Sequence, residues 1–253
     1  SLVYADKVRK ATILRKNVLV KGSVIGGGVF SYALKKHIKS GLKVFITEKA
    51  AYTIRNDLEE VIESGFKIIE QEKPNFKGEI LNLEEINIET IKEFLAKFGE
   101  NLSEVDYVAI AVQDHGVSPK NISDRQFRIQ KIEEFLQKNP YPEALAFKEK
   151  NIPPIFLRMR SAAKDSKKYL PNAEVMLMDT APAAIFGCLE DPIVKNIHKK
   201  IVINVGNGHT WATIIDNRKI VGSVEHHTKM LTSRKFEQLL IRFANGDLKN
   251  QEV

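Results

Sequence analysis

The sequence predicts a soluble α/β protein with mixed sheets flanked by helices. In the first half of the chain, short β-rich runs alternate with longer helical patterns, and this alternation is typical of parallel strands joined by right-handed crossovers. Near the C-terminus three strand-like runs follow one another at spacings too short for crossover helices, which indicates an antiparallel meander. The 43% hydrophobic and 28% charged content is that of an ordinary globular protein.

In the first half, turn residues separate the expected strands from the expected helices, and Gly41 and Gly65 end two of the helices. The run at residues 105–112 (VDYVAIAV) is continuously apolar, so we expect a buried central strand there. The expected strands are residues 17–21, 42–47, 66–70 and 105–112, with a further short strand within 74–83. The expected helices are residues 29–40, 49–64, 88–98 and 124–137.

The second half begins after two proline-containing breaks at residues 139–142 and 151–154. They suggest an α/β lobe at residues 1–150 and a second at 151–253, with one continuous domain as the alternative. The expected strands are residues 175–178, 201–205, 210–216 and 219–224, and the expected helices are 182–189 and 234–244.

Composition excludes several classes of function. No apolar run approaches the roughly 18 residues that span a bilayer, and no signal-peptide pattern opens the chain, so we expect a cytoplasmic protein without a membrane partner. The formal charge of +7 comes largely from scattered lysines, which favours anionic ligands and not sequence-specific nucleic acid binding. The single cysteine, Cys188, excludes an internal disulfide framework.

The segment at residues 204–210 (NVGNGHT) carries the strongest chemical signal. Gly206 and Gly208 lie between two strands, where glycine lets backbone amides approach a phosphate closely, and the Thr210 hydroxyl could donate to a phosphoryl oxygen. Asn204, Asn207 and His209 complete this expected phosphate-binding turn. The alternative is an ordinary Asn-Gly hairpin.

Three further segments contain candidate site residues. Gly26, Gly27 and Gly28 join a strand to a helix, where they could hold phosphate at the helix N-terminus or only permit close packing. Gln113, Asp114 and His115 follow the apolar strand; Asp114 could act as a general base and His115 could contact phosphate or metal, or both could cap backbone groups. Asp179 is either a site carboxylate or a helix N-cap.

Histidines support an alternative chemistry. His226 and His227 follow the third meander strand, and because neighbours in a strand point to opposite faces only one of them can face a given site. With His115 and His209 they could form the metal centre of a hydrolase. Four arginines could bind an anionic substrate or form surface ion pairs: Arg125, Arg128, Arg158 and Arg160.

The pattern of an apolar strand, a polar residue, x-Gly-x-Gly-x-Thr and two further strands resembles the second phosphate loop of the actin, sugar kinase and heat-shock-70 ATPase superfamily. The resemblance implies an actin-like (ribonuclease H-like) architecture, ATP and Mg²⁺ as ligands, and a phosphotransferase or ATPase. Asn204 stands where those proteins usually have an aspartate that acts on magnesium through water. A non-catalytic regulator on a nucleotide-binding fold therefore stays an alternative.

Seven segments in order also resemble a prokaryotic family labelled as related to the pyruvate formate-lyase activating enzyme. That resemblance implies a first phosphate loop ahead of Ser1 and a Gly-Gly-His-Gly-type stretch after Val253, so we expect the central part of a longer protein. An activase needs a set of cysteine thiolates on an iron–sulfur cluster, which Cys188 alone cannot supply. The segments are residues 25–28 (IGGG), 50–53 (AAYT), 111–116 (AVQDHG), 123–128 (SDRQFR), 178–184 (MDTAPAA), 204–210 (NVGNGHT) and 225–228 (EHHT).

The leading hypothesis is a nucleotide-binding protein that takes ATP or another phosphorylated small molecule. It predicts one cleft lined by Gly206, Gly208, Gln113, Asp114 and Asp179.

Overall fold

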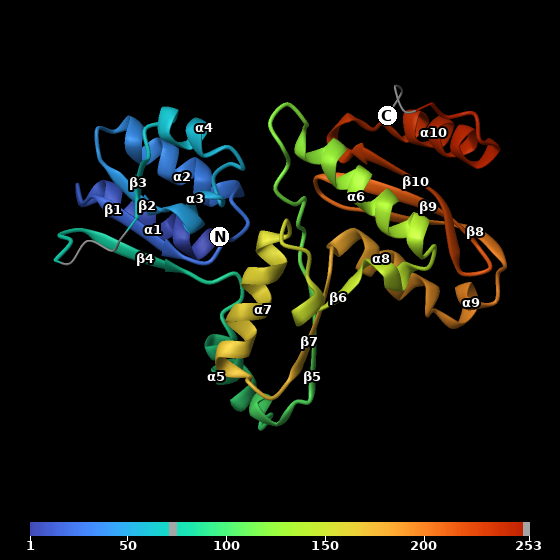
Figure 1. Ribbon diagram of the computed structural model, residues 1–253, viewed down its shortest axis with the longest axis horizontal. Helices are drawn as coiled ribbons and strands as arrows, with labels where there is room; N and C mark the ends of the chain where they lie inside the picture. Colours follow the sequence, from blue (N-terminus) through green and yellow to red (C-terminus); the bar gives the residue numbers. More distant parts are fainter. Residues whose placement is uncertain (71–74, 250–253) are drawn as a thin grey trace. The chain divides into compact units, whose positions relative to one another are not determined.

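The computed structural model describes residues 1–70 and 75–249, which form a mixed α/β protein (Figure 1). The chain divides into two compact units, both discontinuous in sequence. Unit 1 comprises Ser1–Phe127 and Lys148–Leu177, and unit 2 comprises Arg128–Phe147 and Met178–Val253. The division differs from the expected lobes at residues 1–150 and 151–253, because residues 128–147 pack with the C-terminal segment while residues 148–177 return to the first unit.

Unit 1 is built on a parallel sheet of four strands in the order β3-β2-β1-β4. The strands are β1 (Val18–Gly22), β2 (Val44–Thr47), β3 (Lys67–Ile69) and β4 (Glu79–Leu83). Every pairing in this sheet is parallel, which confirms the prediction from the alternating pattern. The strand order turns back at β1, which lies between β2 and β4, and such a switch point places a crevice at the carboxyl ends of the strands.

Four helices belong to this sheet: α1 (Leu2–Ile13), α2 (Gly28–Lys39), α3 (Glu48–Ala51) and α4 (Leu58–Glu63). The core contains Val18 and Val20 of β1, Phe30 and Leu34 of α2 and Ala5 of α1. Helix α1 escaped the sequence analysis because the residues that it buries, Ala5, Val8 and Ala11, are small and mark its apolar face weakly.

The prediction of one continuous helix at residues 49–64 was wrong. It is broken between α3 and α4, where the side chain of Asp57 accepts a hydrogen bond from the Glu59 amide at 2.8 Å and caps α4. A side chain that bonds the backbone in this way starts a new helix instead of continuing the old one.

The rest of unit 1 contains α5 (Ile88–Ala96), the 3₁₀ turn η1 (Leu102–Glu104), β5 (Tyr107–Ala111), η3 (Glu149–Asn151), α7 (Leu157–Tyr169) and β7 (Glu174–Met178). Strand β6 (Ala146–Lys148), in which the chain passes from the second unit back to the first, completes a small sheet of order β5-β7-β6. The prediction of a buried central strand at residues 105–112 was therefore wrong, since β5 is an edge strand and Tyr107 is 77% exposed. An apolar run alone does not distinguish the two positions.

Unit 2 contains the antiparallel meander, in the order β10-β9-β8, which confirms the prediction from the short spacings. Its strands are β8 (Lys199–Val205), β9 (His209–Asp216) and β10 (Lys219–His227). Asn217 and Arg218 both have positive φ, as the type I′ turn between β9 and β10 requires. The other elements are α6 (Asp124–Lys138), which begins in unit 1, η2 (Pro142–Leu145), α8 (Thr180–Leu189), α9 (Pro192–Lys195), η4 (Thr228–Met230) and α10 (Ser233–Asn245).

Helices cover both faces of the meander. On one face Trp211 and Ile215 pack against Ile185 and Leu189 of α8, with apolar residues of α6 beside them. On the other face Ala212 and Val224 pack against Phe243 of α10. Side chains at alternate positions of β9 therefore point either towards α6 and α8 or towards α10.

Within residues 1–70 and 75–249, no helix combines the length and the apolar character that crossing a membrane requires.

Candidate functional site

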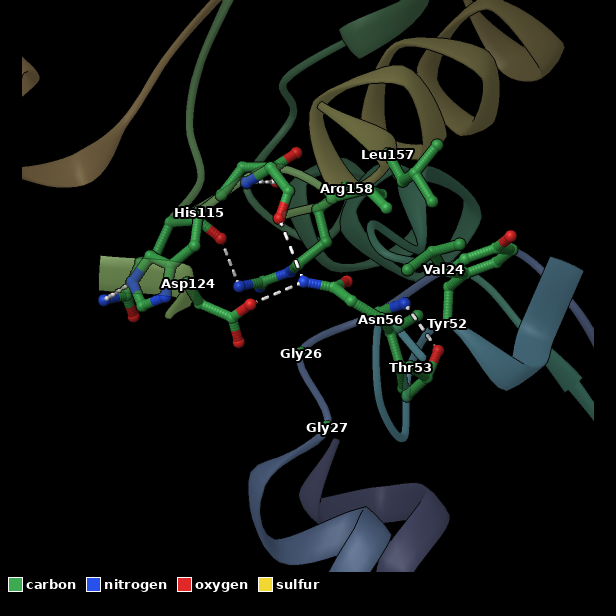
Figure 2. A pocket seen from close by; sticks show the side chains of 15 residues that line it. Val24, Gly26, Gly27, Tyr52, Thr53, Asn56, His115, Asp124, Leu157 and Arg158 are labelled. Carbon is green, nitrogen blue, oxygen red and sulfur yellow. Dashed lines mark hydrogen bonds between the residues drawn. The ribbon is translucent and has the colours of Figure 1, made fainter. Parts of the chain in front are cut away.

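A polar cavity of about 170 Å³ lies within unit 1. It is formed by the segments that follow β1, α3 and β5, together with the first turn of α7 (Figure 2). Ligands of open α/β sheets bind at this end of the strands. The lining residues are Val24, Ile25, Gly26, Gly27, Tyr52, Thr53, Asn56, Gln113, Asp114, His115, Gly116, Val117, Asp124, Leu157 and Arg158.

Two backbone amides of the segment at residues 25–28, those of Ile25 and Gly26, are already bonded within unit 1. The Gly26 amide donates to Glu85 Oε2 at 3.0 Å, and the Ile25 amide donates to Thr53 Oγ1 at 3.1 Å. A Cβ on Gly27 would lie 2.2 Å from the Thr53 carbonyl oxygen, so glycine is needed there for close packing. Gly28 is the first residue of α2 and has a φ of +32°. The geometry of Gly26 and Gly27 therefore favours the packing alternative over an open phosphate cradle.

Arg158 is held by an internal carboxylate. Its Nη2 lies 2.6 Å from Glu85 Oε1, and its Nη1 donates to the Gln113 carbonyl. A Cβ on Gly26 would lie 2.9 Å from Arg158 Nη2, so the bare glycine also makes room for the guanidinium. Since Glu85 neutralises this charge, Arg158 serves as a structural bridge across the pocket rather than as an open anion receptor.

Asp114 caps helix α7. The carboxylate is 6% exposed and accepts hydrogen bonds from the Gly116 amide at 3.0 Å and the Met159 amide at 2.9 Å. The residue at the N-cap of α7, Phe156, has no side-chain acceptor, so Asp114 supplies one from the loop after β5. Burial raises the pKa of Asp114, and the two backbone hydrogen bonds oppose that rise. The carboxylate is occupied as a cap, which was the alternative to the general-base role.

The other polar groups of the cavity are connected by hydrogen bonds. Gln113 Nε2 lies 3.1 Å from His115 Nε2. Asn56 donates to the Gly116 carbonyl at 3.1 Å and to Asp124 Oδ1 at 2.8 Å, and the labelled side chains of Asn56 and Asp124 meet in Figure 2. Sequence reasoning missed Asn56, Glu85 and Asp124 as site residues. Glu85 follows β4 at the carboxyl end of the strand beside β1, and this position could have identified it.

In unit 2 the expected phosphate-binding turn joins β8 to β9. The Gly206 amide donates to the His209 carbonyl at 3.0 Å, so Asn207 and Gly208 form a two-residue connection. Neither Asn207 nor Gly208 is among the residues with positive φ, in contrast to Asn217 and Arg218 of the next turn. The connection is therefore not the type I′ turn that an ordinary Asn-Gly hairpin adopts.

The two glycines of this turn have different surroundings. A Cβ on Gly206 would lie 2.8 Å from the His209 carbonyl oxygen, so the backbone itself requires glycine there. A Cβ on Gly208 would meet no atom within 4 Å. Neither an unusual φ nor a neighbour among the described residues explains Gly208.

Thr228, the first residue after β10, anchors the turn. Its amide donates to the Gly208 carbonyl at 3.0 Å and its hydroxyl donates to the Gly206 carbonyl at 2.6 Å. The Thr210 hydroxyl lies 3.1 Å from the Thr228 hydroxyl, and Thr210 is 4% exposed. The structure thus places the Thr210 hydroxyl against Thr228 within the chain, whereas we expected it to donate to a phosphate.

A buried charge network lies on the meander face covered by α6 and α8. Arg128 bonds Glu225 Oε2 at 2.5 Å and Asp179 Oδ1 at 2.7 Å, and its side chain is 3% exposed. Glu225 Oε1 lies 2.7 Å from His209 Nδ1. Asp179 also accepts from the Ala181 amide at 3.1 Å as the N-cap of α8. Arg128 is therefore not available to an anionic substrate, contrary to the expectation for that residue.

The histidines expected to bind metal are distributed over different surfaces. His227 pairs with His209 across the meander, with ring centroids 4.8 Å apart, whereas His226 pairs with Thr210 and so belongs to the opposite face. His115 belongs to unit 1. Among residues 1–70 and 75–249, no group of three His, Cys, Asp or Glu side chains is arranged to hold a metal ion.

The expected site residues thus form two groups. Gly26, Gly27, Gln113, Asp114 and His115 line the cavity of unit 1. In unit 2, Asn204 pairs with Trp211 and shares its face of the sheet with His209, and Asp179 joins that face through Arg128. The expected cleft would combine residues of both groups, and it stays a prediction.

Comparison with known proteins gives one result that decides membership. Residues 25–253 match the model of the family described as "Putative pyruvate format-lyase activating enzyme (DUF1786)". The chain belongs to this family. It matches none of the curated proteins and none of the solved structures compared with it. The matched region of this DUF1786 member includes both the cavity of unit 1 and the turn of unit 2, and its one cysteine, Cys188, cannot hold a cluster alone.

Proposed function

We propose that this DUF1786 protein binds ATP with Mg²⁺ through the turn at residues 206–210 and acts as a phosphotransferase or ATPase with an actin-like architecture. The observation that carries the proposal is the geometry of Gly208. Its φ is one that any residue adopts, and open space surrounds the place of its missing side chain. A residue with no internal reason to be glycine leaves bare backbone that an anion can approach closely.

The strand pattern supports the same assignment. A strand, the glycine turn and two antiparallel strands follow one another without interruption in β8, β9 and β10. This is the order in which the actin-like superfamily presents its second phosphate loop. The net charge of +7 also favours a polyanionic ligand over a cationic one.

Removing the bare backbone at Gly208 tests the proposal. Gly208→Val should weaken equilibrium binding of ATP·Mg²⁺ about tenfold or more. It should leave thermal unfolding of the chain unchanged, since Gly208 has no positive φ and a Cβ there would meet no atom within 4 Å. Gly187→Ala is the matched control, because Gly187 in α8 is also surrounded by open space but lies outside the turn. Equal ATP affinity in wild type and Gly208→Val overturns the proposal.

Asn204 favours a second candidate function, a regulator that binds nucleotide without turning it over. A neutral amide holds a hydrated magnesium ion less well than a carboxylate does. ATP turnover by the wild-type chain identifies the enzyme. Nucleotide binding without turnover in the wild-type chain identifies the regulator.

A further inference from the structure

We propose that Thr228 is the positioning residue of the phosphate-binding turn, and that the backbone amides of Asn207 and Gly208 are the donors that the turn presents to the anion. The inference rests on the proposed function, because it names how that same turn engages a phosphoryl group. It begins from two hydrogen bonds. The Thr228 hydroxyl donates to the Gly206 carbonyl at 2.6 Å, and the Thr228 amide donates to the Gly208 carbonyl at 3.0 Å.

These two hydrogen bonds fix the directions of two peptide units in the turn. The peptide units are trans, so in each of them the C=O and the N–H point in opposite directions. The unit that joins Gly206 to Asn207 has its carbonyl bonded to Thr228, and it therefore directs the Asn207 amide away from Thr228. The next carbonyl but one, that of Gly208, is held by the Thr228 backbone. One residue outside the turn thus sets the orientation of its backbone.

The amides of Asn207 and Gly208 have no acceptor in the part of the chain that the structure describes, residues 1–70 and 75–249. The Gly206 amide, by contrast, donates to the His209 carbonyl at 3.0 Å. Asn207 and Gly208 are both exposed, so a ligand can reach their amides. Adjacent backbone N–H groups in a turn are a common means of binding an anion. The turn therefore offers two donors to a phosphoryl group.

The Thr228 hydroxyl is itself held in one orientation. Its hydrogen is used for the Gly206 carbonyl, so in the 3.1 Å contact with the Thr210 hydroxyl it is Thr210 that donates. Thr210 is 4% exposed, so water does not compete for this bond. The turn is thus ordered before a ligand arrives, and such preorganisation raises affinity because less freedom is lost on binding.

The side chain and the backbone of Thr228 have separable roles. Thr228→Val keeps the amide that holds the Gly208 carbonyl and keeps a β-branched side chain, but it releases the Gly206 carbonyl. The peptide unit that carries the Asn207 amide then loses its fixed direction. Thr228→Ser retains the hydroxyl and with it both hydrogen bonds.

Equilibrium binding of ATP·Mg²⁺ to the full chain tests the positioning role. Thr228→Val should bind about tenfold more weakly than the wild type, and Thr228→Ser should recover most of the affinity. Thr213→Val is the matched control and should bind as the wild type does. It makes the same substitution in β9, at a hydroxyl that is buried without a hydrogen-bond partner among the described residues.

Two results of this experiment overturn the inference. In the first, Thr228→Val binds as tightly as the wild type. In the second, Thr228→Ser binds as weakly as Thr228→Val, which would show that the hydroxyl is not the group responsible. Either result, together with weakened binding by Gly208→Val, leaves the proposed function intact. Absence of ATP·Mg²⁺ binding by the wild type overturns both.

Amide NMR of the nitrogen-15-labelled wild-type chain tests the two donors without any variant. Saturation with ATP·Mg²⁺ should move the Asn207 and Gly208 amide protons downfield, as new hydrogen bonds to phosphoryl oxygens require, and should slow their exchange with solvent. Amide signals of Asn207 and Gly208 that stay unchanged at saturation overturn the inference.

Discussion

The carboxylate of Asp114 accepts the amide of Met159 at 2.9 Å, and this bond joins the loop after β5 to the first turn of α7. Because Arg158 immediately precedes Met159, the same bond also holds the backbone from which the Arg158 side chain reaches Glu85. Asp114 therefore caps α7 and, through the same hydrogen bond, helps to position Arg158 in the pocket of unit 1.

Removing that cap should destabilise the chain. Asp114→Ala leaves the amides of Gly116 and Met159 without their acceptor, at a cost of about 1–3 kcal/mol in the free energy of unfolding. Asp114→Asn should cost less, because its one carbonyl oxygen can replace only part of the carboxylate. Urea denaturation of the three proteins measures the difference. Equal unfolding free energies in Asp114→Ala and wild type would contradict the capping role.

His37 should make the chain sensitive to acid. The Thr12 hydroxyl donates to the Val8 carbonyl at 2.8 Å, so the His37 Nδ1–H must donate to Thr12 Oγ1 at 2.7 Å, and Nε2 is buried without a partner among the described residues. Burial lowers the pKa of His37 below its ordinary value of 6.5. The unfolded chain therefore binds the proton more readily than the folded chain does.

It follows that the contribution of His37 to stability is complete above about pH 6.5 and falls as the pH drops towards the lowered folded pKa. Unfolding free energies measured between about pH 5 and 7.5 should show this slope in wild type. The slope should be smaller in His37→Phe, which keeps an aromatic ring in the core but cannot take up a proton. The same slope in both proteins would show that His37 is not the group responsible.

Arg128 should be essential for the stability of unit 2. Arg128→Met leaves the carboxylates of Asp179 and Glu225 buried without their cation, and breaking a buried ion pair in this way costs about 3–5 kcal/mol. Arg128→Lys should restore only part of the loss, because an ammonium group cannot present two separate nitrogens to two carboxylates. Arg234→Met, on the exposed surface of α10, is the control and should change stability by less than about 0.5 kcal/mol. Chemical denaturation that finds both methionine variants equally stable contradicts the account.

The local parts of the fold could be predicted from the sequence. The parallel strands of unit 1 and the meander of unit 2 follow from the spacing between β-rich runs, which is a property of neighbouring residues. The break between α3 and α4 was missed although the Asp57 cap that starts α4 is a local signal, whereas the hydrogen bond from Asn56 in that break to Gly116, 60 residues away, could not be predicted. No local pattern records such a partner.

The candidate site shows the same limit. The turn at residues 204–210 was predicted from its own residues. Two features of Gly208 argue against an ordinary Asn-Gly hairpin, namely the absence of a positive φ and the open space at the place of a side chain. The sequence shows neither feature. The network behind the turn joins Arg128 to partners 51 and 97 residues away. Arg128 therefore looked like an anion receptor in the sequence, whereas in the structure it positions Glu225.

Calorimetric titration of the wild-type chain with ATP·Mg²⁺, repeated with Gly208→Val, tests the central claim most directly. The account predicts saturable binding at one site per chain for the wild type and an affinity about tenfold or more lower for the variant at unchanged thermal stability. A wild-type chain that gives no saturable binding, or a variant that binds as tightly as the wild type, would contradict the assignment of the turn as a phosphate site.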